Sequence, residues 1–111
     1  MCTVFGYWGK GINNEDVQRC LNTTISRGPD DQRIADLSGR GFLAFQRLAI
    51  MDLSDCGMQP FELDGDLVVC NGEIYGFRTL KEELIKKGYS FNSNSDCEIL
   101  LPLYKEYGPR M

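Results

Sequence analysis

The second residue of the chain is a cysteine, and a cysteine at this position can combine a nucleophile and a base in one residue. Its side chain is small enough to permit removal of Met1, which would leave the thiol of Cys2 beside a free α-amine. Because an α-amine has a reference pKa of about 7.7–8.0, it can take the thiol proton at neutral pH, directly or through a water. This chemistry needs no histidine, and the sequence has none. The alternative is that Cys2 is simply a small residue.

Three other polar features could bind or stabilise a substrate. Asn71 and Gly72 follow an apolar run and offer a side-chain amide and a backbone N–H to a developing oxyanion, although Asn-Gly is also common in turns. Arg47 lies in an apolar run, where a guanidinium needs either a structural carboxylate partner or a substrate carboxylate. Asp96 could receive a substrate ammonium, or it could cap a helix.

Length and composition indicate one folded domain. The chain has 111 residues, of which 42% are hydrophobic and 25% are charged, as in ordinary globular proteins. The net charge is −4 and the basic residues are scattered, so we expect no nucleic-acid partner. The sequence has neither a secretory signal pattern nor about 18 consecutive apolar residues, which predicts no membrane association and a cytoplasmic location.

The five cysteines do not form a metal-binding pattern. They are an odd number, they form no C-x-x-C pair, and no histidine accompanies them, so we expect no metal site and reduced thiols. Cys20 and Cys70 fall on apolar faces of predicted elements. We therefore interpret both as packing residues.

Strand and helix patterns alternate through the first two thirds of the chain. The aromatic and β-branched run 3–8 predicts a strand, and Asn13 or Asn14 can cap a helix that ends near Arg27. The predicted buried face of this helix contains Val17, Cys20, Leu21, Thr24 and Ile25. Segments 33–37 and 41–52 predict a hairpin, and Asp64-Gly65 predicts a second hairpin.

The last third predicts two helices. Residues 78–87 have an apolar stripe of Leu80, Leu84 and Ile85, and Gly88 can end this helix. Ser95 and Glu98 fit a capping box for a further helix, in which Pro102 should cause a kink. The order of elements predicts an α+β domain with antiparallel sheet rather than a βαβ repeat.

Five motifs together resemble one family. They are Met1-Cys2, Arg27-Gly28-Pro29-Asp30, Arg47-Leu48-Ala49-Ile50, Asn71-Gly72-Glu73-Ile74-Tyr75 and Ser95-Asp96-Cys97-Glu98. In this order and at this spacing they resemble the class II glutamine amidotransferase domain of glutamine-hydrolysing asparagine synthetases. Five ordered motifs disfavour a purely structural module in which Cys2 occurs by chance.

The resemblance implies a role for each matching residue. Cys2 would attack the side-chain amide of glutamine to form a glutamyl thioester, with its own α-amine as base, and Asn71 and Gly72 would form the oxyanion hole. The glutamine site would comprise Arg47, Leu48, Ile50, Glu73 and Asp96. Within it, Arg47 would hold the α-carboxylate, and Glu73 and Asp96 would hold the α-ammonium.

The resemblance also implies an N-terminal-nucleophile hydrolase fold, an αββα sandwich of antiparallel sheets, which we expect to be incomplete. Residues 1–111 would be a partial amidotransferase domain that lacks its C-terminal part and a synthetase domain. Ammonia would pass to that synthetase domain, which would act on aspartate with ATP and magnesium, in a full-length protein that forms a homodimer. No cofactor is expected in residues 1–111.

Some positions depart from the family pattern. The family often has histidine near the positions of Ser26 and of Phe45 and Gln46, and asparagine at the position of Gly76. None of these residues has an assigned catalytic role, so we expect an effect on loop packing rather than on mechanism. The alternative function is an inactive remnant, or a module that binds glutamine or associates with a partner.

Overall fold

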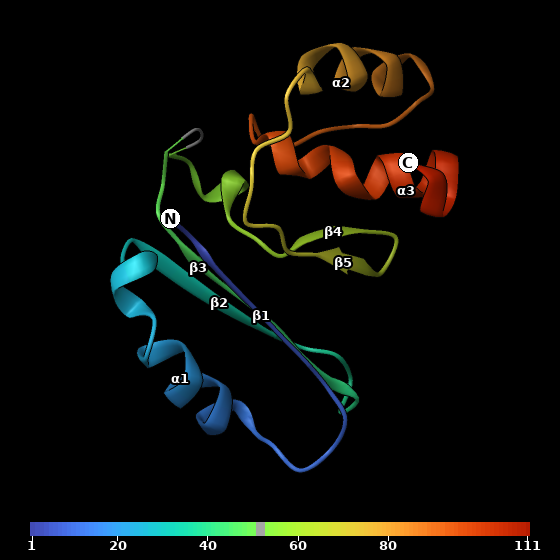
Figure 1. Cartoon of the computed structure of the whole chain (residues 1–111). Helices are drawn as coiled ribbons and strands as arrows, with labels where there is room; N and C mark the ends of the chain where they lie inside the picture. The colour runs from blue at the N-terminus through green and yellow to red at the C-terminus, as the bar shows by residue number, and fades with distance from the viewer. Residues whose placement is uncertain (51–52) are drawn as a thin grey trace.

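The computed structural model of the chain describes residues 1–50 and 53–111, and in this part it has an α+β fold with antiparallel sheets. The elements form two groups (Figure 1). Helix α1 (Asn14–Asn22) lies along a three-stranded sheet, whereas α2 (Phe77–Lys86), α3 (Leu100–Tyr107) and a two-stranded sheet lie together at one end of it. The predicted class is therefore confirmed, and the four-layer sandwich stays a prediction.

The three-stranded sheet has the order β1-β3-β2, and both pairings are antiparallel. Its strands are β1 (Thr3–Trp8), β2 (Asp31–Asp36) and β3 (Gly41–Arg47). The register pairs Thr3 with Gln46, so Cys2 lies beside the end of β3. The hairpin prediction is confirmed, but its second strand ends at Arg47 rather than at residue 52, and residues 51–52 lie outside the described range.

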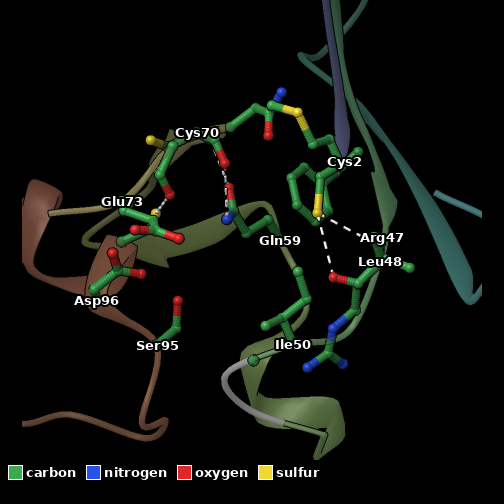
Figure 2. Close-up of a pocket in the computed structure, with 15 residues that line it drawn as sticks. Cys2, Arg47, Leu48, Ile50, Gln59, Cys70, Glu73, Ser95 and Asp96 are labelled. Atoms are coloured by element: carbon green, nitrogen blue, oxygen red, sulfur yellow. Dashed lines mark hydrogen bonds between the residues drawn. The ribbon is translucent and has the colours of Figure 1, made fainter. Parts of the chain in front are cut away.

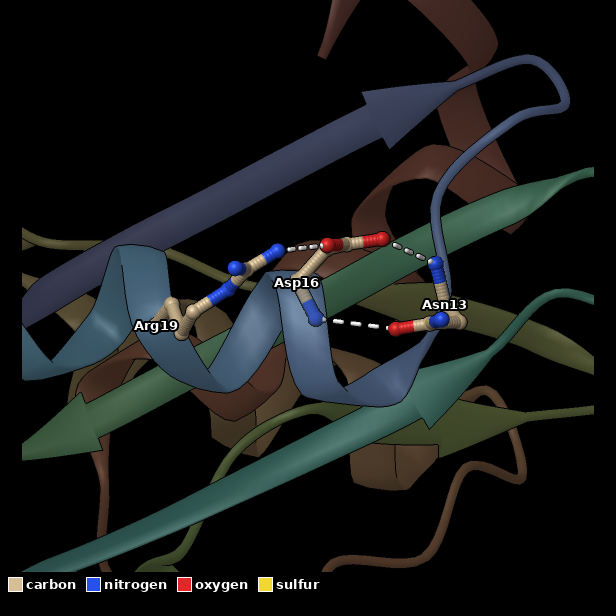
Figure 3. Close-up of polar contacts among 3 residues, drawn as sticks. All are labelled: Asn13, Asp16 and Arg19. Atoms are coloured by element: carbon tan, nitrogen blue, oxygen red, sulfur yellow. Dashed lines mark hydrogen bonds and ion pairs between the residues drawn. The ribbon is translucent and has the colours of Figure 1, made fainter.

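Helix α1 (Asn14–Asn22) begins with the cap that the sequence predicted. The Asn13 side chain accepts a hydrogen bond from the Asp16 N–H (3.0 Å), and the Asp16 carboxylate accepts one from the Asn13 N–H (2.9 Å) (Figure 3). Arg19 forms an ion pair with the same carboxylate. These contacts satisfy amides that have no partner inside the helix.

The buried face of α1 is narrower than predicted. Val17 and Leu21 pack against Phe42 and Ala44 of β3 in the first apolar cluster. The helix ends at Asn22, before a 3₁₀ turn at Ile25–Arg27, so its direction changes before Ile25. Ile25 is therefore 46% exposed. Cys20 is exposed as well, and its interpretation as a packing residue was wrong.

The second group contains the predicted Asp64-Gly65 hairpin, with β4 (Phe61–Leu63) paired to β5 (Asp66–Val68). Asp64 and Gly65 have φ values of 53° and 85°, as a two-residue turn with two left-handed residues requires. The second apolar cluster forms where Phe61, Cys97 and Leu101 pack together, with Cys70 against them. The packing role of Cys70 is thus confirmed.

The two helices of this group are α2 (Phe77–Lys86) and α3 (Leu100–Tyr107). Only part of the predicted stripe of α2 faces inward, since Leu84 is buried, Leu80 is half-buried and Ile85 is 51% exposed. Gly88, with φ of 104°, follows the end of α2 as predicted.

The predicted capping box before α3 was wrong. Ser95 makes no capping side-chain bond, and a 3₁₀ turn (Asp96–Ile99) precedes the helix. The Glu98 carboxylate instead accepts hydrogen bonds from the N–H groups of Asn92 and Ser93, both at 2.8 Å. Pro102 is the third residue of α3, where an amide would have no intrahelical partner, so the proline does not have to kink the helix.

Candidate active site

A pocket of about 180 Å³ lies between the two groups. Segments far apart in the sequence line it: the N-terminus, the end of β3, the loop before β4, residues 70–73 and residues 95–97. All eight predicted site residues are among them, namely Cys2, Arg47, Leu48, Ile50, Asn71, Gly72, Glu73 and Asp96. In Figure 2, Cys2, Arg47 and Leu48 lie on one side, and Glu73, Ser95 and Asp96 lie on the other.

The Cys2 thiol is half-buried and is held by the backbone of Leu48. Its Sγ accepts a hydrogen bond from the Leu48 N–H at 3.3 Å and lies 3.5 Å from the Leu48 carbonyl oxygen, to which the thiol can donate. The pairing of β1 with β3 produces this contact, because it aligns Thr3 with Gln46 and brings the preceding residue to the end of β3.

The Arg27-Gly28-Pro29-Asp30 motif fixes the end of β3 rather than lining the pocket. The Asp30 N–H donates to the Arg47 carbonyl (2.9 Å), and the Asp30 carboxylate accepts from the Ala49 N–H (2.8 Å). A Cβ on Gly28 would lie 2.5 Å from the Gln46 carbonyl carbon and oxygen. Only glycine permits this close approach, so the motif positions Arg47 and Leu48.

Arg47 is a buried residue, 7% exposed, that lines the pocket. One of its terminal nitrogens donates to the Ser54 carbonyl at 2.7 Å. Among residues 1–50 and 53–111, no carboxylate forms an ion pair with it. Because a guanidinium has five N–H donors in a planar fork, this group can hold a carboxylate through two of them.

Asp96 gives the opposite wall a buried negative charge. The side chain is 4% exposed, and its Oδ2 accepts a hydrogen bond from the Ile74 N–H at 2.6 Å. The carboxylate is therefore bonded to the segment after Gly72 and not to a helix end, so the helix-cap interpretation was wrong. Glu73 is exposed beside it at the pocket wall.

Asn71 and Gly72 lie in an exposed stretch beyond β5 and line the pocket. The Cys97 thiol lies 3.7 Å from the Gly72 carbonyl oxygen, at hydrogen-bonding distance. Burial raises the pKa of Cys97 far above its ordinary value, and the neighbouring Cys70 thiol and Asp96 carboxylate add to the shift. Cys97 therefore stays a neutral thiol and is a poor nucleophile, although it lines the pocket together with Cys2.

Sequence reasoning missed Gln59, a buried residue that lines the pocket and bonds to the backbone of Cys70. A glutamine directly before a proline and a predicted hairpin was its only signal. Gln46, one of the departures from the family pattern, does not disturb the packing. It is fully buried, donates to the Leu21 carbonyl (2.7 Å) and accepts from the Thr24 hydroxyl (2.8 Å).

A cysteine thiol and an amide side chain line one pocket, with a guanidinium and a carboxylate on facing walls, and this set of groups suits a thiol-dependent amide hydrolase. Comparison with protein families identifies the family. The sequence model of the family described as glutamine amidotransferase domain matches residues 1–111, and the chain belongs to this family. The resemblance inferred from the five motifs is confirmed.

The similar curated proteins are much longer than this chain. A probable asparagine synthetase (glutamine-hydrolyzing) of Acanthamoeba polyphaga mimivirus is 41% identical over 108 residues, which cover 92% of this chain and 19% of the relative. Asparagine synthetase (glutamine-hydrolyzing) 1 of Bacillus subtilis is 36% identical, with 96% and 18% covered. Amidase chry2 of Gibberella zeae is 40% identical, with 85% and 14% covered. The chain thus spans less than a fifth of the length of these relatives.

Proposed function

We propose that the chain is the glutamine-hydrolysing part of an asparagine synthetase, and that Cys2 is its nucleophile. The observation that carries the proposal is the convergence of all eight predicted residues on one pocket. They come from motifs that lie as much as 94 positions apart, from residue 2 to residue 96. Chance would not be expected to place them together.

Catalysis requires that Met1 has first been removed. Met1 is 70% exposed and so accessible to a peptidase. The Cys2 thiol gives its proton to the freed α-amine, and its sulfur forms a bond to the side-chain amide carbon of glutamine. The carbonyl oxygen becomes an oxyanion, which the Asn71 side chain and the Gly72 N–H stabilise. The proton then passes to the leaving nitrogen, ammonia departs, and a glutamyl thioester remains. Water hydrolyses the thioester to glutamate and restores the thiol.

The two facing walls account for recognition of a zwitterion. Arg47, with Leu48 and Ile50 beside it, holds the α-carboxylate of glutamine. Glu73 and Asp96 hold the α-ammonium. A substrate fixed at both charged ends would extend its side chain toward Cys2, so that binding and orientation come from the same contacts.

The remaining steps belong to the longer protein that the relatives suggest. Residues 1–111 would be part of an αββα sandwich of the N-terminal-nucleophile hydrolase type. The ammonia would pass to a synthetase domain that uses ATP and magnesium to amidate aspartate, in a homodimeric cytoplasmic protein. The 111-residue chain alone would then make no asparagine, and a robust ATP-dependent yield of asparagine from it would contradict the proposal.

The test is the intact mass of the chain before and after treatment with a glutamine-like electrophile, followed by peptide mapping. We expect loss of Met1 and one adduct, on Cys2, from which glutamine protects. The exposed thiols of Cys20 and Cys56 supply the internal control, because they react first if labelling follows exposure alone. Retained Met1, or unselective labelling of the five thiols, would instead support an inactive remnant or a binding module.

A further inference from the structure

Among the residues that the structure describes, none pairs as a strand with the segment that carries Asn71 and Gly72. Strand β5 ends at Val68 and α2 begins at Phe77. The side chains of Gln59, Cys97 and Asp96 lie at hydrogen-bonding distance from backbone atoms of this segment, at Cys70, Gly72 and Ile74 in turn. The geometry of this segment therefore depends on a few side chains and not on a sheet.

Gln59 makes the two bonds on the N-terminal side of the segment. Its Oε1 accepts from the Cys70 N–H at 2.6 Å, and its Nε2 donates to the Cys70 carbonyl at 3.1 Å (Figure 2). The side chain is only 4% exposed. A buried primary amide without partners would be costly, so a pair of bonds to one residue is a strong constraint on that residue's backbone.

The β4–β5 register explains why a side chain is used here. The register pairs Phe61 with Val68, so its continuation by two residues places position 59 opposite position 70. Pro60 lies between and has no N–H to donate, and the ladder stops at Phe61. The amide group of Gln59 then bonds to both backbone groups of Cys70, as a strand partner would.

We propose that Gln59 is a positioning residue for the oxyanion hole, an inference that rests on the proposed function. Asn71 follows Cys70 directly, so the two bonds of Gln59 set the direction in which the Asn71 amide and the Gly72 N–H leave the hairpin. Donors to an oxyanion act only when they are aimed at the place where charge develops. The α-carboxylate and α-ammonium contacts do not involve this segment's first residues. Loss of Gln59 should thus impair attack more than binding.

The test replaces Gln59 by methionine, which has a similar shape and no hydrogen-bonding amide. The reagent is a chloroketone analogue of glutamine, and the rate of inactivation is measured against its concentration. This gives the concentration for half-maximal inactivation (KI), which reports binding, and the maximal rate constant (kinact), which reports attack by Cys2. We expect Gln59→Met to lower kinact by roughly 100-fold, the loss that a misplacement of about 1 Å can produce, with KI little changed. Gln46→Met is the matched control, because Gln46 is also a buried glutamine with two hydrogen bonds, made to Leu21 and Thr24 outside the pocket.

The Gln46→Met control also removes a buried amide group, but one that lies outside the pocket. It should therefore lower the free energy of unfolding while kinact stays near that of the parent chain. Equal losses of kinact in both variants, or a parent-like kinact in Gln59→Met, would overturn the role of Gln59 while the proposed function stands. A parent chain that the chloroketone does not label on Cys2 would instead contradict the proposed function.

Amide hydrogen exchange tests the contact without relying on activity. We expect the Cys70 N–H to be protected in the parent chain and in Gln46→Met, and to exchange much faster in Gln59→Met. An unprotected Cys70 N–H in the parent chain would overturn the inference whatever the outcome of labelling.

Discussion

At the scale of single residues, the proposed function places two demands on the Asp96 carboxylate. One oxygen accepts the Ile74 N–H at 2.6 Å, and the side chain lies at the pocket wall with 4% exposure. The hydrogen bond needs only an acceptor, whereas recognition of an ammonium group needs the negative charge. These two demands can be separated by a substitution that keeps the acceptor.

We predict that Asp96→Asn raises the KM for glutamine by roughly 10–100-fold and changes kcat less. Loss of a hydrogen bond to a charged group costs about 1.5–3 kcal/mol, which corresponds to this range. The measurement is glutamate release as a function of glutamine concentration. Asp36→Asn is the control, since Asp36 is exposed at the far end of β2, opposite Phe42, and does not line the pocket, and it should leave KM unchanged. A fall in kcat with unchanged KM would assign Asp96 to the reacting atoms instead.

At the scale of elements, the end of β3 is set by the loop that approaches it. Gly28 lies against the backbone of Gln46 and Arg47 so closely that an added Cβ would be 2.5 Å from the Gln46 carbonyl and 2.9 Å from the Arg47 nitrogen. These are backbone atoms and cannot move as a flexible side chain could. A side chain at this position must displace either the loop or the strand end.

We predict that Gly28→Ala lowers the free energy of unfolding by about 1–3 kcal/mol, the usual cost of overpacking, and slows labelling of Cys2 because Leu48 shifts. Gly6→Ala is the matched control. Its Cβ would meet Leu43 at 3.6 Å, an ordinary contact, so it should be close to neutral. Urea unfolding of the three proteins is the measurement, and equal stability of the two variants would contradict the steric explanation.

The Glu106 carboxylate joins α3 to the residues that follow α2. It accepts from Lys87 Nζ and from the Tyr89 hydroxyl, both at 3.1 Å. The Lys87 bond, and then the Tyr89 bond, hold the pKa of Glu106 below its ordinary value of 4.5. Because the pKa of Glu106 is lower in the folded than in the unfolded chain, the ionised carboxylate stabilises the fold above pH 4.5. This stabilisation is lost as the pH falls through the folded-state pKa.

We therefore predict that Glu106→Gln destabilises the chain at pH 7 and that the difference shrinks as the pH falls and the parent carboxylate takes up its proton. Urea unfolding at pH 7 and at about pH 3 measures this. Glu82→Gln, an exposed change on α2, should show no such pH-dependent difference. A difference that stays constant between the two pH values would mean that charge is not the cause.

The elements that local chemistry determines could be predicted from the sequence. The Asn13 cap and the Asp64-Gly65 turn depend on residues within four positions of one another, and both were found. The errors arose where contacts outside the expected local pattern decide the outcome. Glu98 bonds to Asn92 and Ser93 instead of capping α3, because the loop before it supplies free N–H groups. The bond of Gln59 to Cys70 spans eleven positions, and no local pattern marks it.

The eight predicted site residues line one pocket, and their roles stay a prediction. All eight came from motifs, which mark side chains that can do chemistry and say little about the contacts that support them. The supporting contacts were missed for that reason: the Asp30 bonds to the end of β3 and the Gln59 bonds to Cys70 involve backbone atoms, which carry no residue-type signal.

At the scale of the whole molecule, the pocket lies between two apolar clusters that are built from different parts of the chain. The first joins α1 to the three-stranded sheet, and the second joins the β4–β5 hairpin to α3. The Cα radius of gyration of 14.5 Å exceeds the about 13 Å expected for a compact domain of this length. The dimensions of 42 × 28 × 21 Å agree with two clusters placed along one axis. No helix among the described residues is long and apolar enough to cross a membrane.

This architecture predicts that glutamine stabilises the folded chain by linking the two clusters. The Arg47 wall continues from β3, whose Phe42 and Ala44 belong to the first cluster, and the Asp96 wall is next to Cys97 of the second. A ligand held at both ends can bind only when both clusters are folded and correctly placed. Its binding free energy is then added to the free energy of unfolding.

We expect the Cys2→Ala variant, which binds glutamine without consuming it, to gain about 2.7 kcal/mol at a glutamine concentration 100 times Kd. For a domain of this size that gain corresponds to a rise in Tm of roughly 10–20 °C.

D-glutamine is the control ligand, because its α-carboxylate and α-ammonium cannot reach Arg47 and Asp96 together while the side chain points to residue 2. Equal shifts with both enantiomers would show binding without the proposed recognition. No shift with either would show that the two walls do not form one glutamine site, and Asp96→Asn in the same background should reduce any shift that L-glutamine produces.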